Sequence, residues 1–308
     1  MIKSFYNMTL PRFRSNEKKI NKAINIGIYA EHLLVQKLCD RYVRTHYKSC
    51  QKELNKNPRE QQIIVSMTTI PSRISALHYT LKSIFNQTLM PDRVILWITD
   101  LIENTNQVED ALREEIDHGL EIRFVKDIRV HTKYYYAMKE FPNDLIITID
   151  DDIMYEEDLF ERLYEAHTKN PGCVIAARTH EITWSGKKIN SYRAWHMLAP
   201  GVKNDAKSLI ALGVGGVLYP PNILYKDWEN IDLFLRLSPG NDDIWLKVME
   251  TMAGTPVVKL SKYTRENFIL GNTQTVALSN DNVKNNRNDV LMNQIVDYYG
   301  IDASFFSD

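Results

Sequence analysis

The sequence predicts an α/β protein whose mainly parallel, Rossmann-like central sheet is flanked by helices and preceded by a helical N-terminal extension. From residue 62 onward, short β-branched and aromatic runs alternate with segments of helical periodicity, as in βαβ units. Residues 145–149 form an Ile-rich apolar run, typical of a strand buried on both faces, and three carboxylates follow it directly. Residues 1–58 also differ in charge from the rest of the chain. We therefore expect a basic helical extension over residues 1–58 and one α/β domain over residues 59–308.

The composition is that of an ordinary soluble globular protein, with 308 residues of which 44% are apolar and 25% charged. No run of about twenty apolar residues is present, and the N-terminus lacks the apolar core of a secretory signal. The cysteines, Cys39, Cys50 and Cys173, show no metal-ligand spacing, which indicates a reducing compartment. We expect a cytoplasmic protein without a nucleic-acid partner.

The N-terminal extension carries a charge that the overall value of −1 conceals. Residues 1–58 contain 12 Lys or Arg and 4 Asp or Glu, whereas the remainder contains 26 and 35. Apolar residues at three-to-four spacing predict a helix over residues 16–50, and Asn55–Pro58 is interpreted as a linker. Such a basic arm suits an anionic membrane surface, on the inner face of the cell membrane, or a second subunit. The alternative is a basic helix that covers the acidic domain.

The first half of the main domain reads as strand, helix, strand, helix, strand, helix and strand. Ser72 is expected to cap the first of these helices, and Pro91 separates that helix from the next strand. The strands are expected over residues 63–67, 94–98, 120–124 and 145–149, and the helices over residues 74–85, 107–118 and 131–138.

The second half continues the pattern with an excursion in the middle. Elements are expected at residues 156–168 (helix), 174–177 (strand), from 242 (helix), 257–260 (strand) and 286–299 (helix). Residues 180–210 place Trp184, Tyr192, Trp195 and His196 among polar residues. We interpret this segment as one that faces a substrate.

Asp150, Asp151 and Asp152 are the strongest candidates for a functional site. Adjacent carboxylates repel, burying an unpaired one is costly, and no Lys or Arg lies within several residues on either side. Oxygen ligands beyond the carboxyl end of a strand suit a hard divalent cation that keeps positions open for phosphate oxygens. The alternative is a solvated acidic turn.

Asp242 and Asp243 form a second acidic pair, at the start of a helix. Asp at that position is commonly a cap or a partner of the helix dipole. The second possibility is catalysis, because an acceptor hydroxyl needs a nearby base to take its proton.

Further candidates stand at the ends of the predicted strands. Thr68, Arg73 and Asp100 follow the first two strands, and with Lys133 they could hold a nucleotide, although each alone is more often structural. Tyr134, Tyr135 and Tyr136 could stack on a base, but at least one must belong to the core.

The glycines at 213, 215 and 216 lack the Walker spacing, so we expect close approach of a ligand or a strand rather than a phosphate loop. We predict that Gly215, Gly216, Trp195 and His196 contact the acceptor, with a structural role as the alternative for the lone His196.

These residues resemble a known superfamily. The stretches Val65-Ser-Met-Thr-Thr-Ile-Pro-Ser-Arg73, Ile146-Ile-Thr-Ile-Asp-Asp-Asp-Ile153 and Asn241-Asp-Asp-Ile-Trp245 are similar to glycosyltransferases of the GT-A fold. Within it, they resemble a bacterial family-2-like group that builds capsular and lipopolysaccharide sugars. The resemblance covers about residues 62–300.

The resemblance implies a role for each candidate. Asp152, with Asp150, would bind Mn²⁺ or Mg²⁺ on the diphosphate of a nucleotide-sugar. Asp150 would also contact the ribose, and Asp151 the sugar or the metal shell. Thr68, Arg73, Asp100 and Lys133 would hold the nucleotide. Asp243 would be the base, while Asp242 stands where the family has Glu. The family's downstream metal-binding His has no counterpart, because His196 is the last histidine.

The sequence therefore predicts a metal-dependent inverting glycosyltransferase that moves a sugar from a nucleotide-sugar, expected to be UDP-linked, to a saccharide or lipid-linked acceptor. A nucleotidyltransferase acting on sugar phosphates is one rival, but it would require a Gly-rich, basic loop after the first strand. A non-catalytic carbohydrate-binding assembly subunit is the other.

Overall fold

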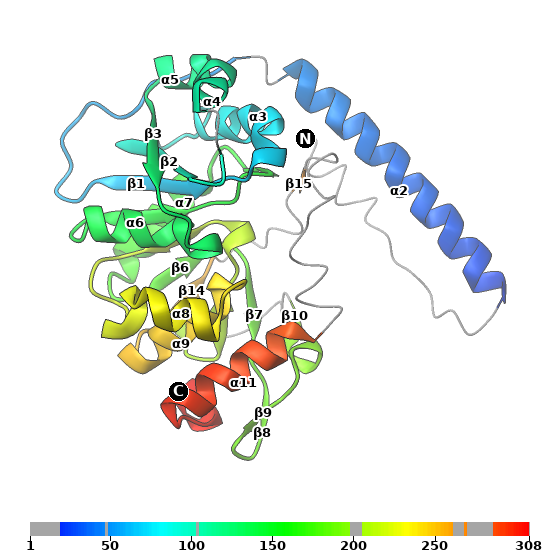
Figure 1. Ribbon diagram of the computed structural model, residues 1–308. Coiled ribbons are helices and arrows are strands. Elements are labelled where there is room, and N and C mark those ends of the chain that lie inside the picture. The colour runs from blue at the N-terminus through cyan, green and yellow to red at the C-terminus, as the bar shows by residue number, and fades with distance from the viewer. Residues whose placement is uncertain are drawn as a thin grey trace.

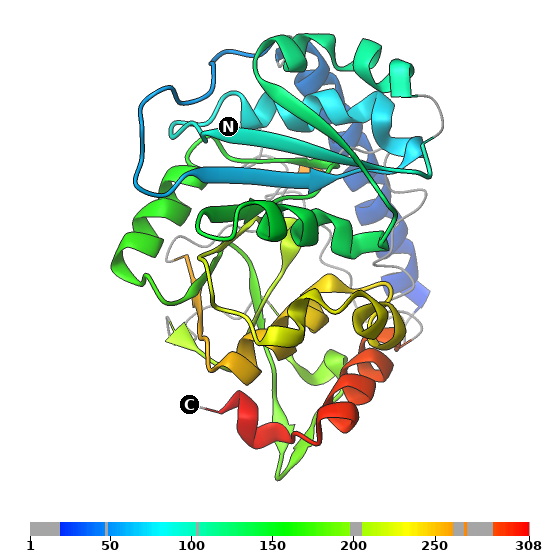
Figure 2. The same cartoon turned by 60° about the vertical axis from the view of Figure 1, so that its left-hand side comes forward.

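A computed structural model describes residues 19–46, 49–102, 105–197, 205–260, 268–269 and 286–307. Its main feature is an eight-stranded sheet with helices on both faces (Figures 1 and 2). The strands of this sheet are β1 (Ile63–Thr68), β2 (Arg93–Thr99), β3 (Leu120–Val125), β4 (Leu145–Thr148), β6 (Val174–Ala176), β11 (Asp205–Ala206), β13 (Val217–Tyr219) and β14 (Val257–Lys259). Their spatial order is β11-β14-β6-β13-β4-β1-β2-β3. The predicted fold class, a mainly parallel sheet flanked by helices, is confirmed.

The sheet is mainly parallel, with two reversed strands. β1 pairs in parallel with β2 and β4, β2 with β3, and β14 with β6. β13 runs antiparallel to both β4 and β6, and the short β11 is antiparallel to β14. The carboxyl ends of β1, β2 and β4 therefore meet at one edge of the sheet, where ligands bind in open α/β sheets.

Alternating side chains of the central strands pack on opposite faces of the sheet. Ile63, Val65 and Met67 of β1 face α3 (Ile74–Ile84) and α7 (Leu159–Lys169). Ile64 faces the other way, against Ala137 of α6 (Thr132–Glu140). Because both faces are covered, β4 is buried along its whole length, as predicted for this Ile-rich strand.

A second buried cluster lies under the C-terminal half of the chain. It unites α6 with α8 (Ile231–Leu237), α9 (Asp242–Ala253) and α11 (Arg287–Tyr299). A small antiparallel sheet flanks it, in the order β10 (His196–Met197), β7 (Thr179–Glu181) and β12 (Leu209–Ala211). The hairpin of β8 (Trp184–Ser185) and β9 (Lys188–Ile189) extends from this sheet near α11 (Figure 1).

Three local predictions differ from the structure. Ser72 does not cap α3, because a 3-10 turn, η1 (Pro71–Arg73), precedes that helix and the cap position falls on Arg73 without a side-chain bond. The helix expected over residues 107–118 is divided into α4 (Thr105–Ala111) and α5 (Arg113–Asp117), because Leu112 between them is not helical. The strand expected to run through Ile149 ends at Thr148.

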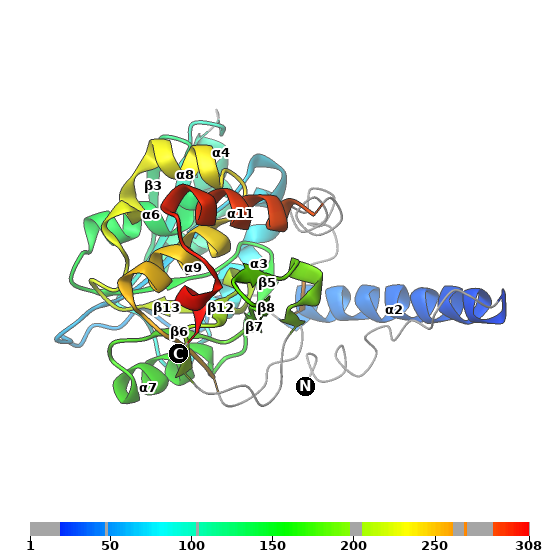
Figure 3. The same ribbon diagram turned by 90° about the horizontal axis from the view of Figure 1, so that it is seen from below.

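The N-terminal extension contains the helix α2 (Lys19–His46), which projects from the domain (Figures 1 and 3). None of the helices in the described ranges is both long and apolar enough to cross a membrane. Residues 55–58, expected to be a linker, are bound to the domain. Asn55 donates its backbone N–H to Pro91 O and its side-chain amide to Asp92. Residues 1–18 lie outside the described ranges.

Candidate active site

Asp151 is the buried centre of the acidic turn that follows β4. Its side chain is 4% exposed. One carboxylate oxygen accepts a hydrogen bond from Thr69 Oγ1 at 2.6 Å, and the other pairs with Arg73 Nη1 at 2.6 Å. Its backbone carbonyl accepts from Thr80 Oγ1 of α3. Because protein groups hold both oxygens, we interpret Asp151 as the residue that fixes the turn and Arg73.

Asp152 lies beside Asp151, and its surroundings disfavour the ionised form of its carboxyl group. Arg73 Nη2 is 3.3 Å from its carboxylate. Burial and, after it, the negative charge of Asp150 raise the pKa of Asp152 to about 7. A carboxylate in this position is stabilised by any further positive charge that reaches it.

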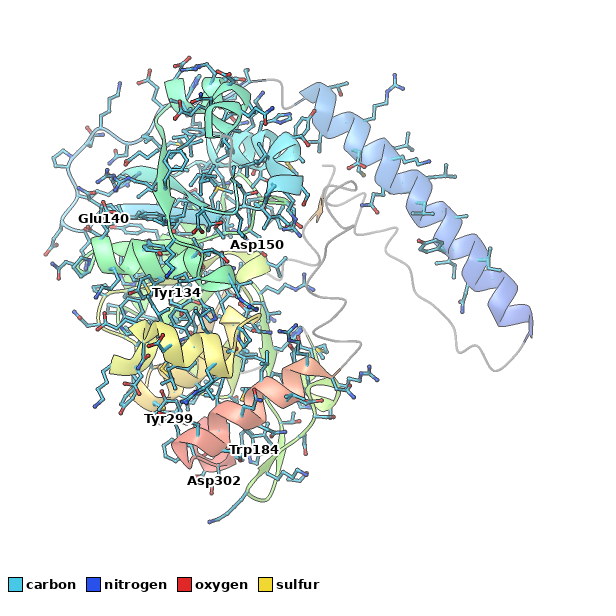
Figure 4. The ribbon with its side chains drawn as sticks, viewed as in Figure 1. Tyr134, Glu140, Asp150, Trp184, Tyr299 and Asp302 are labelled. Carbon is cyan, nitrogen blue, oxygen red and sulfur yellow. The ribbon has the colours of Figure 1, made fainter. Side chains whose placement is uncertain are left out.

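Asp150 is more exposed than its two neighbours and faces Lys133. Lys133 Nζ is 2.9 Å from Asp150 Oδ1, and the Asp150 backbone N–H donates to the Tyr155 hydroxyl. Figure 4 labels Asp150, beyond the end of β4, and Tyr134, on α6 beside Lys133 in sequence.

Lys133 joins the acidic turn to the second acidic pair. The same ammonium that contacts Asp150 also lies 2.9 Å from Asp242 Oδ2. Burial alone would lower the pKa of Lys133, but the charges of Asp150, Asp242 and Asp243 raise it well above its ordinary value. Lys133 is therefore a permanent cation shared by two acidic sites.

The backbone of Lys133 is fixed from the sheet. The Ser66 hydroxyl on β1 donates to Lys133 O at 2.6 Å. The Ser66 oxygen in turn accepts the indole N–H of Trp97 on β2. This chain of bonds ties the start of α6 to two central strands.

Asp242 and Asp243 form the first turn of α9. The Asn241 side chain caps the helix by accepting the Ile244 N–H at 2.9 Å. The Asp243 carboxylate accepts the Gly213 N–H at 2.9 Å. Burial and the negative charge of Asp242 raise the pKa of Asp243. Lys133 forms an ion pair with Asp242, and its charge also acts on Asp243, so the burial of Asp243 is only partly compensated.

The glycine-rich loop η4 (Gly213–Gly215) completes the site between β12 and β13. A Cβ on Gly213 would lie 2.7 Å from Lys133 Nζ, and one on Gly215 would lie 2.6 Å from Arg178 Cβ and 2.9 Å from Arg178 N. Gly216 has a φ of +87°, which favours glycine. The loop is thus approached closely by the Lys133 side chain and by Arg178, which connects β6 to β7.

The site lies within a recognisable family domain. Residues 67–225, just over half of the chain, match the model of "Glycosyl transferase family 2". The chain belongs to this family. The acidic turn, Lys133 and the glycine loop all fall within the matched residues.

Solved structures similar to this chain include three that share 11–12% sequence identity with it. They are the mannosyltransferase PcManGT from Pyrobaculum calidifontis in complex with GDP-Man and Mn²⁺ (12% identity, 77% of this chain and 65% of that chain, TM-score 0.43), GalNAc-T7 with UDP, GalNAc and Mn²⁺ (11%, 68% and 46%, 0.45) and S. aureus TarS 1-349 (11%, 67% and 59%, 0.42). The similar part spans less than two thirds of each of those chains. No curated protein sequence matches this chain.

The remaining predicted nucleotide-binding residues have separate surroundings. Thr68 Oγ1 donates to Trp97 O, so this hydroxyl supports the sheet. Asp100 is exposed at the carboxyl end of β2 and accepts the Asp127 N–H. Arg73 directs its guanidinium at Asp151 and Asp152. Asp100 and Arg73 thus follow neighbouring parallel strands.

The predicted acceptor residues are divided between core and surface. Trp195 is 4% exposed, and its indole N–H donates to Asn190 O, so it supports its segment from within. His196 is exposed and lies 2.6 Å from Glu181. Trp184 lies in the β8–β9 hairpin, well away from Asp150 (Figure 4). Of this set, Gly215 and Gly216 lie closest in sequence to Gly213, which contacts Asp243.

Asp150 and Asp152 are the two carboxylates on which the sequence predicted a divalent cation, and each also contacts a protein cation. Within the described ranges, no group of three or more His, Cys, Asp or Glu side chains could hold a metal ion. Asp152 is buried and has like-charged neighbours, and both raise its pKa because they make its ionised form unfavourable. Two carboxylates with the other positions left to phosphate oxygens are a common arrangement for Mg²⁺.

Several residues of the site could not be singled out from the sequence. Thr69, Ser66 and Tyr155 hold Asp151, Lys133 and Asp150, respectively. The prediction selected Thr68 for donor binding, whereas the structure turns Thr69 toward the acidic turn. Thr69 directly follows β1, and side chains alternate along an extended chain, so the two adjacent threonines are expected to face opposite ways.

Proposed function

We propose that this glycosyltransferase transfers a sugar from a nucleotide-sugar, UDP-linked, to a saccharide or lipid-linked acceptor, with inversion and with Mn²⁺ or Mg²⁺. One observation supports this most strongly. A single ammonium, that of Lys133, contacts Asp150 on the donor side and Asp242 on the acceptor side. The predicted donor site and the predicted base therefore adjoin, as a direct displacement requires.

The donor side consists of carboxylates and cations that follow parallel strands. Asp150 and Asp152 would hold the metal ion, and Asp100 and Thr68 would border the nucleoside. Arg73 and Lys133, which contact Asp152 and Asp150, would supply positive charge to the diphosphate. The metal ion, when bound, neutralises charge on the departing nucleoside diphosphate. Asp151 keeps the turn and Arg73 in place.

The acceptor side is centred on Asp243. The acceptor hydroxyl oxygen bonds to the anomeric carbon, while the bond from that carbon to the phosphate oxygen breaks. The nucleoside diphosphate leaves with the electron pair, and Asp243 takes the hydroxyl proton. Attack from the face opposite the leaving group inverts the anomeric centre, which parallels the inverting logic of glycosidases.

The test is the product released from the donor. Incubation with UDP-sugars, GDP-mannose and Mn²⁺ should release nucleoside diphosphate, at a rate that an acceptor increases. A sugar-phosphate nucleotidyltransferase would instead consume nucleoside triphosphate and release pyrophosphate. A non-catalytic subunit would show neither reaction, and the Asp152→Asn variant would then leave the cellular pathway unchanged. Either result would refute the proposal.

The biological setting follows from the same resemblance. We place the reaction in the synthesis of a surface polysaccharide, capsule or lipopolysaccharide, at the cytoplasmic face of the membrane. The catalytic domain would comprise residues 59–308. The basic extension of residues 1–58 would contact the membrane or a second copy of the chain, and the structure of α2 helps to separate these two possibilities.

A further inference from the structure

α2 has one face buried on the domain and another that is apolar and exposed. Val35, Cys39 and Val43 lie on the buried face. On the exposed side, five large apolar residues protrude at helical spacing. They are Ile26 (64% exposed), Tyr29 (53%), Leu33 (41%), Leu34 (63%) and Leu38 (59%). We call this set the apolar face of α2. It extends about 18 Å along the helix at 1.5 Å per residue.

This face is unusual for a protein surface. Isolated exposed apolar residues are ordinary, but a contiguous apolar stripe on a projecting helix marks an interaction site. The helix stands clear of the sheet over much of its length (Figures 1 and 3). The described part of the domain therefore does not cover the stripe.

The charges near the apolar face favour anionic lipid. Lys37 and Arg41 are exposed on the same side of α2, and Glu31 is an exposed acid near its edge. The extension as a whole carries 12 basic and 4 acidic residues over positions 1–58. Long basic side chains beside an apolar stripe can reach lipid phosphates while the stripe enters the headgroup region.

The sequence and charge of α2 disfavour a second copy of the chain as the partner of this apolar face. A coiled coil would need apolar residues to continue every seven positions from Ile26, Tyr29 and Leu33. The next positions in that register are Gln36 and Asp40, which are polar. Two copies would also bring two basic extensions together, and like charges repel.

We infer that the apolar face of α2 docks in the plane of an anionic lipid bilayer, with its basic residues on the lipid phosphates. The docked helix would hold the active site in a defined orientation. Cys39 and Val43 pack with Tyr79 of α3 and with Met154, two residues beyond Asp152. The docking does not depend on the transfer reaction. It deepens the proposed function only by presenting the site to a lipid-linked acceptor.

The test is co-sedimentation of the full chain with vesicles. Vesicles of phosphatidylcholine with phosphatidylglycerol should bind the chain, vesicles of phosphatidylcholine alone should bind it weakly, and added salt should weaken binding. The double variant Ile26→Ser/Leu33→Ser should reduce binding by about tenfold or more, because two anchors of the stripe are lost. A matched control is Val290→Ser, which replaces an exposed apolar residue on α11.

Light scattering on the same samples separates the outcomes. Unchanged vesicle binding by the double variant would overturn the inference, as would equal binding to both kinds of vesicle. If the chain is a dimer that the double variant dissociates, while vesicle binding does not change, the partner is a second copy. Transfer to a water-soluble acceptor should be equal in wild type and double variant. Absence of transfer in both would count against the proposed function, not against docking.

Discussion

Asp242 and Asp243 are adjacent in sequence but have different electrostatic surroundings. The Asp242 carboxylate lies 2.9 Å from the Lys133 ammonium and forms an ion pair with it. Asp243 has the Gly213 N–H as its hydrogen-bond donor, and its pKa is raised by burial and by Asp242. A base works best with a pKa near the working pH, so Asp243 suits proton abstraction.

We predict that Asp243→Asn lowers kcat by about 10²–10⁴-fold, the usual contribution of a general base. Asp242→Asn should cost less, because its carboxylate positions Lys133. In the wild type, kcat/KM should fall as the pH falls through the pKa of Asp243, since the protonated carboxyl cannot accept a proton. The raised pKa moves this loss toward neutral pH. A pH–rate profile that is the same in wild type and Asp243→Asn would contradict the assignment.

Lys133 should be as important for stability as for catalysis. Removing one partner of a buried ion pair costs about 3–5 kcal/mol, because the other charge stays buried and unpaired. We therefore expect Lys133→Met to lower the free energy of unfolding by about that amount in urea. The control is Lys139→Met on the same helix, where an exposed pair with Glu229 predicts a change of about 0–1 kcal/mol.

At the residue scale, the sequence identified the acids better than their partners. Asp150, Asp152, Asp242 and Asp243 could be singled out because acidic residues cluster at a strand end and at a helix start. Their cations could not be assigned, since Arg73 and Lys133 lie far away in sequence and meet the acids only through the sheet. Trp195 was expected to contact the acceptor, yet it is buried, because an isolated Trp carries no signal that separates a core residue from a binding residue.

The η4 loop shows how an element can be fixed by its neighbours. Gly215 passes so close to the Arg178 backbone that a Cβ would be 2.9 Å from its nitrogen. Backbone cannot move aside as a flexible side chain can, so the loop itself would have to shift.

We predict that Gly215→Ala destabilises the protein by about 1–3 kcal/mol, the usual cost of overpacking. It should also lower kcat, because a shifted loop moves Gly213 away from Asp243. Gly172→Ala is the matched control, since nothing lies within 4 Å of a Cβ at that position. Equal melting temperatures for the two variants would contradict the close approach.

At the element scale, apolar periodicity predicted most strands and helices, because burial on both faces leaves a continuous apolar run. The apolar periodicity could not predict whether a strand runs parallel or antiparallel to its neighbours. β13 is an apolar segment like β4, yet it runs antiparallel to its neighbours. The division of α4 from α5 at Leu112 and the 3-10 turn before α3 depend on local backbone angles that side-chain patterns do not encode.

On the scale of the whole molecule, the site joins the two buried clusters of the domain. Asp150 follows β4, whose Ile147 lies in the first cluster, and α9 contributes its apolar side to the second. Ligands that contact both sides should therefore stabilise the entire fold.

We expect Mn²⁺ together with the correct nucleotide to raise the melting temperature more than either alone. At 100 times Kd, a ligand adds about 2.7 kcal/mol to the unfolding free energy. The nucleotide that gives the largest shift should be the one carried by the donor. In Asp152→Asn the part of the shift that depends on Mn²⁺ should disappear, and its persistence there would place the metal elsewhere.

The thiol of Cys39 can report on the contact between α2 and the domain through its rate of alkylation. Its thiol is buried where α2 meets α3, and burial raises its pKa, so alkylating reagents should reach it only after the two helices separate. Cys173 is partly exposed and offers an internal reference on the same chain. The ratio of their labelling rates would measure how often α2 dissociates from the domain. The measurement can be made on free protein and on vesicles, without an engineered probe.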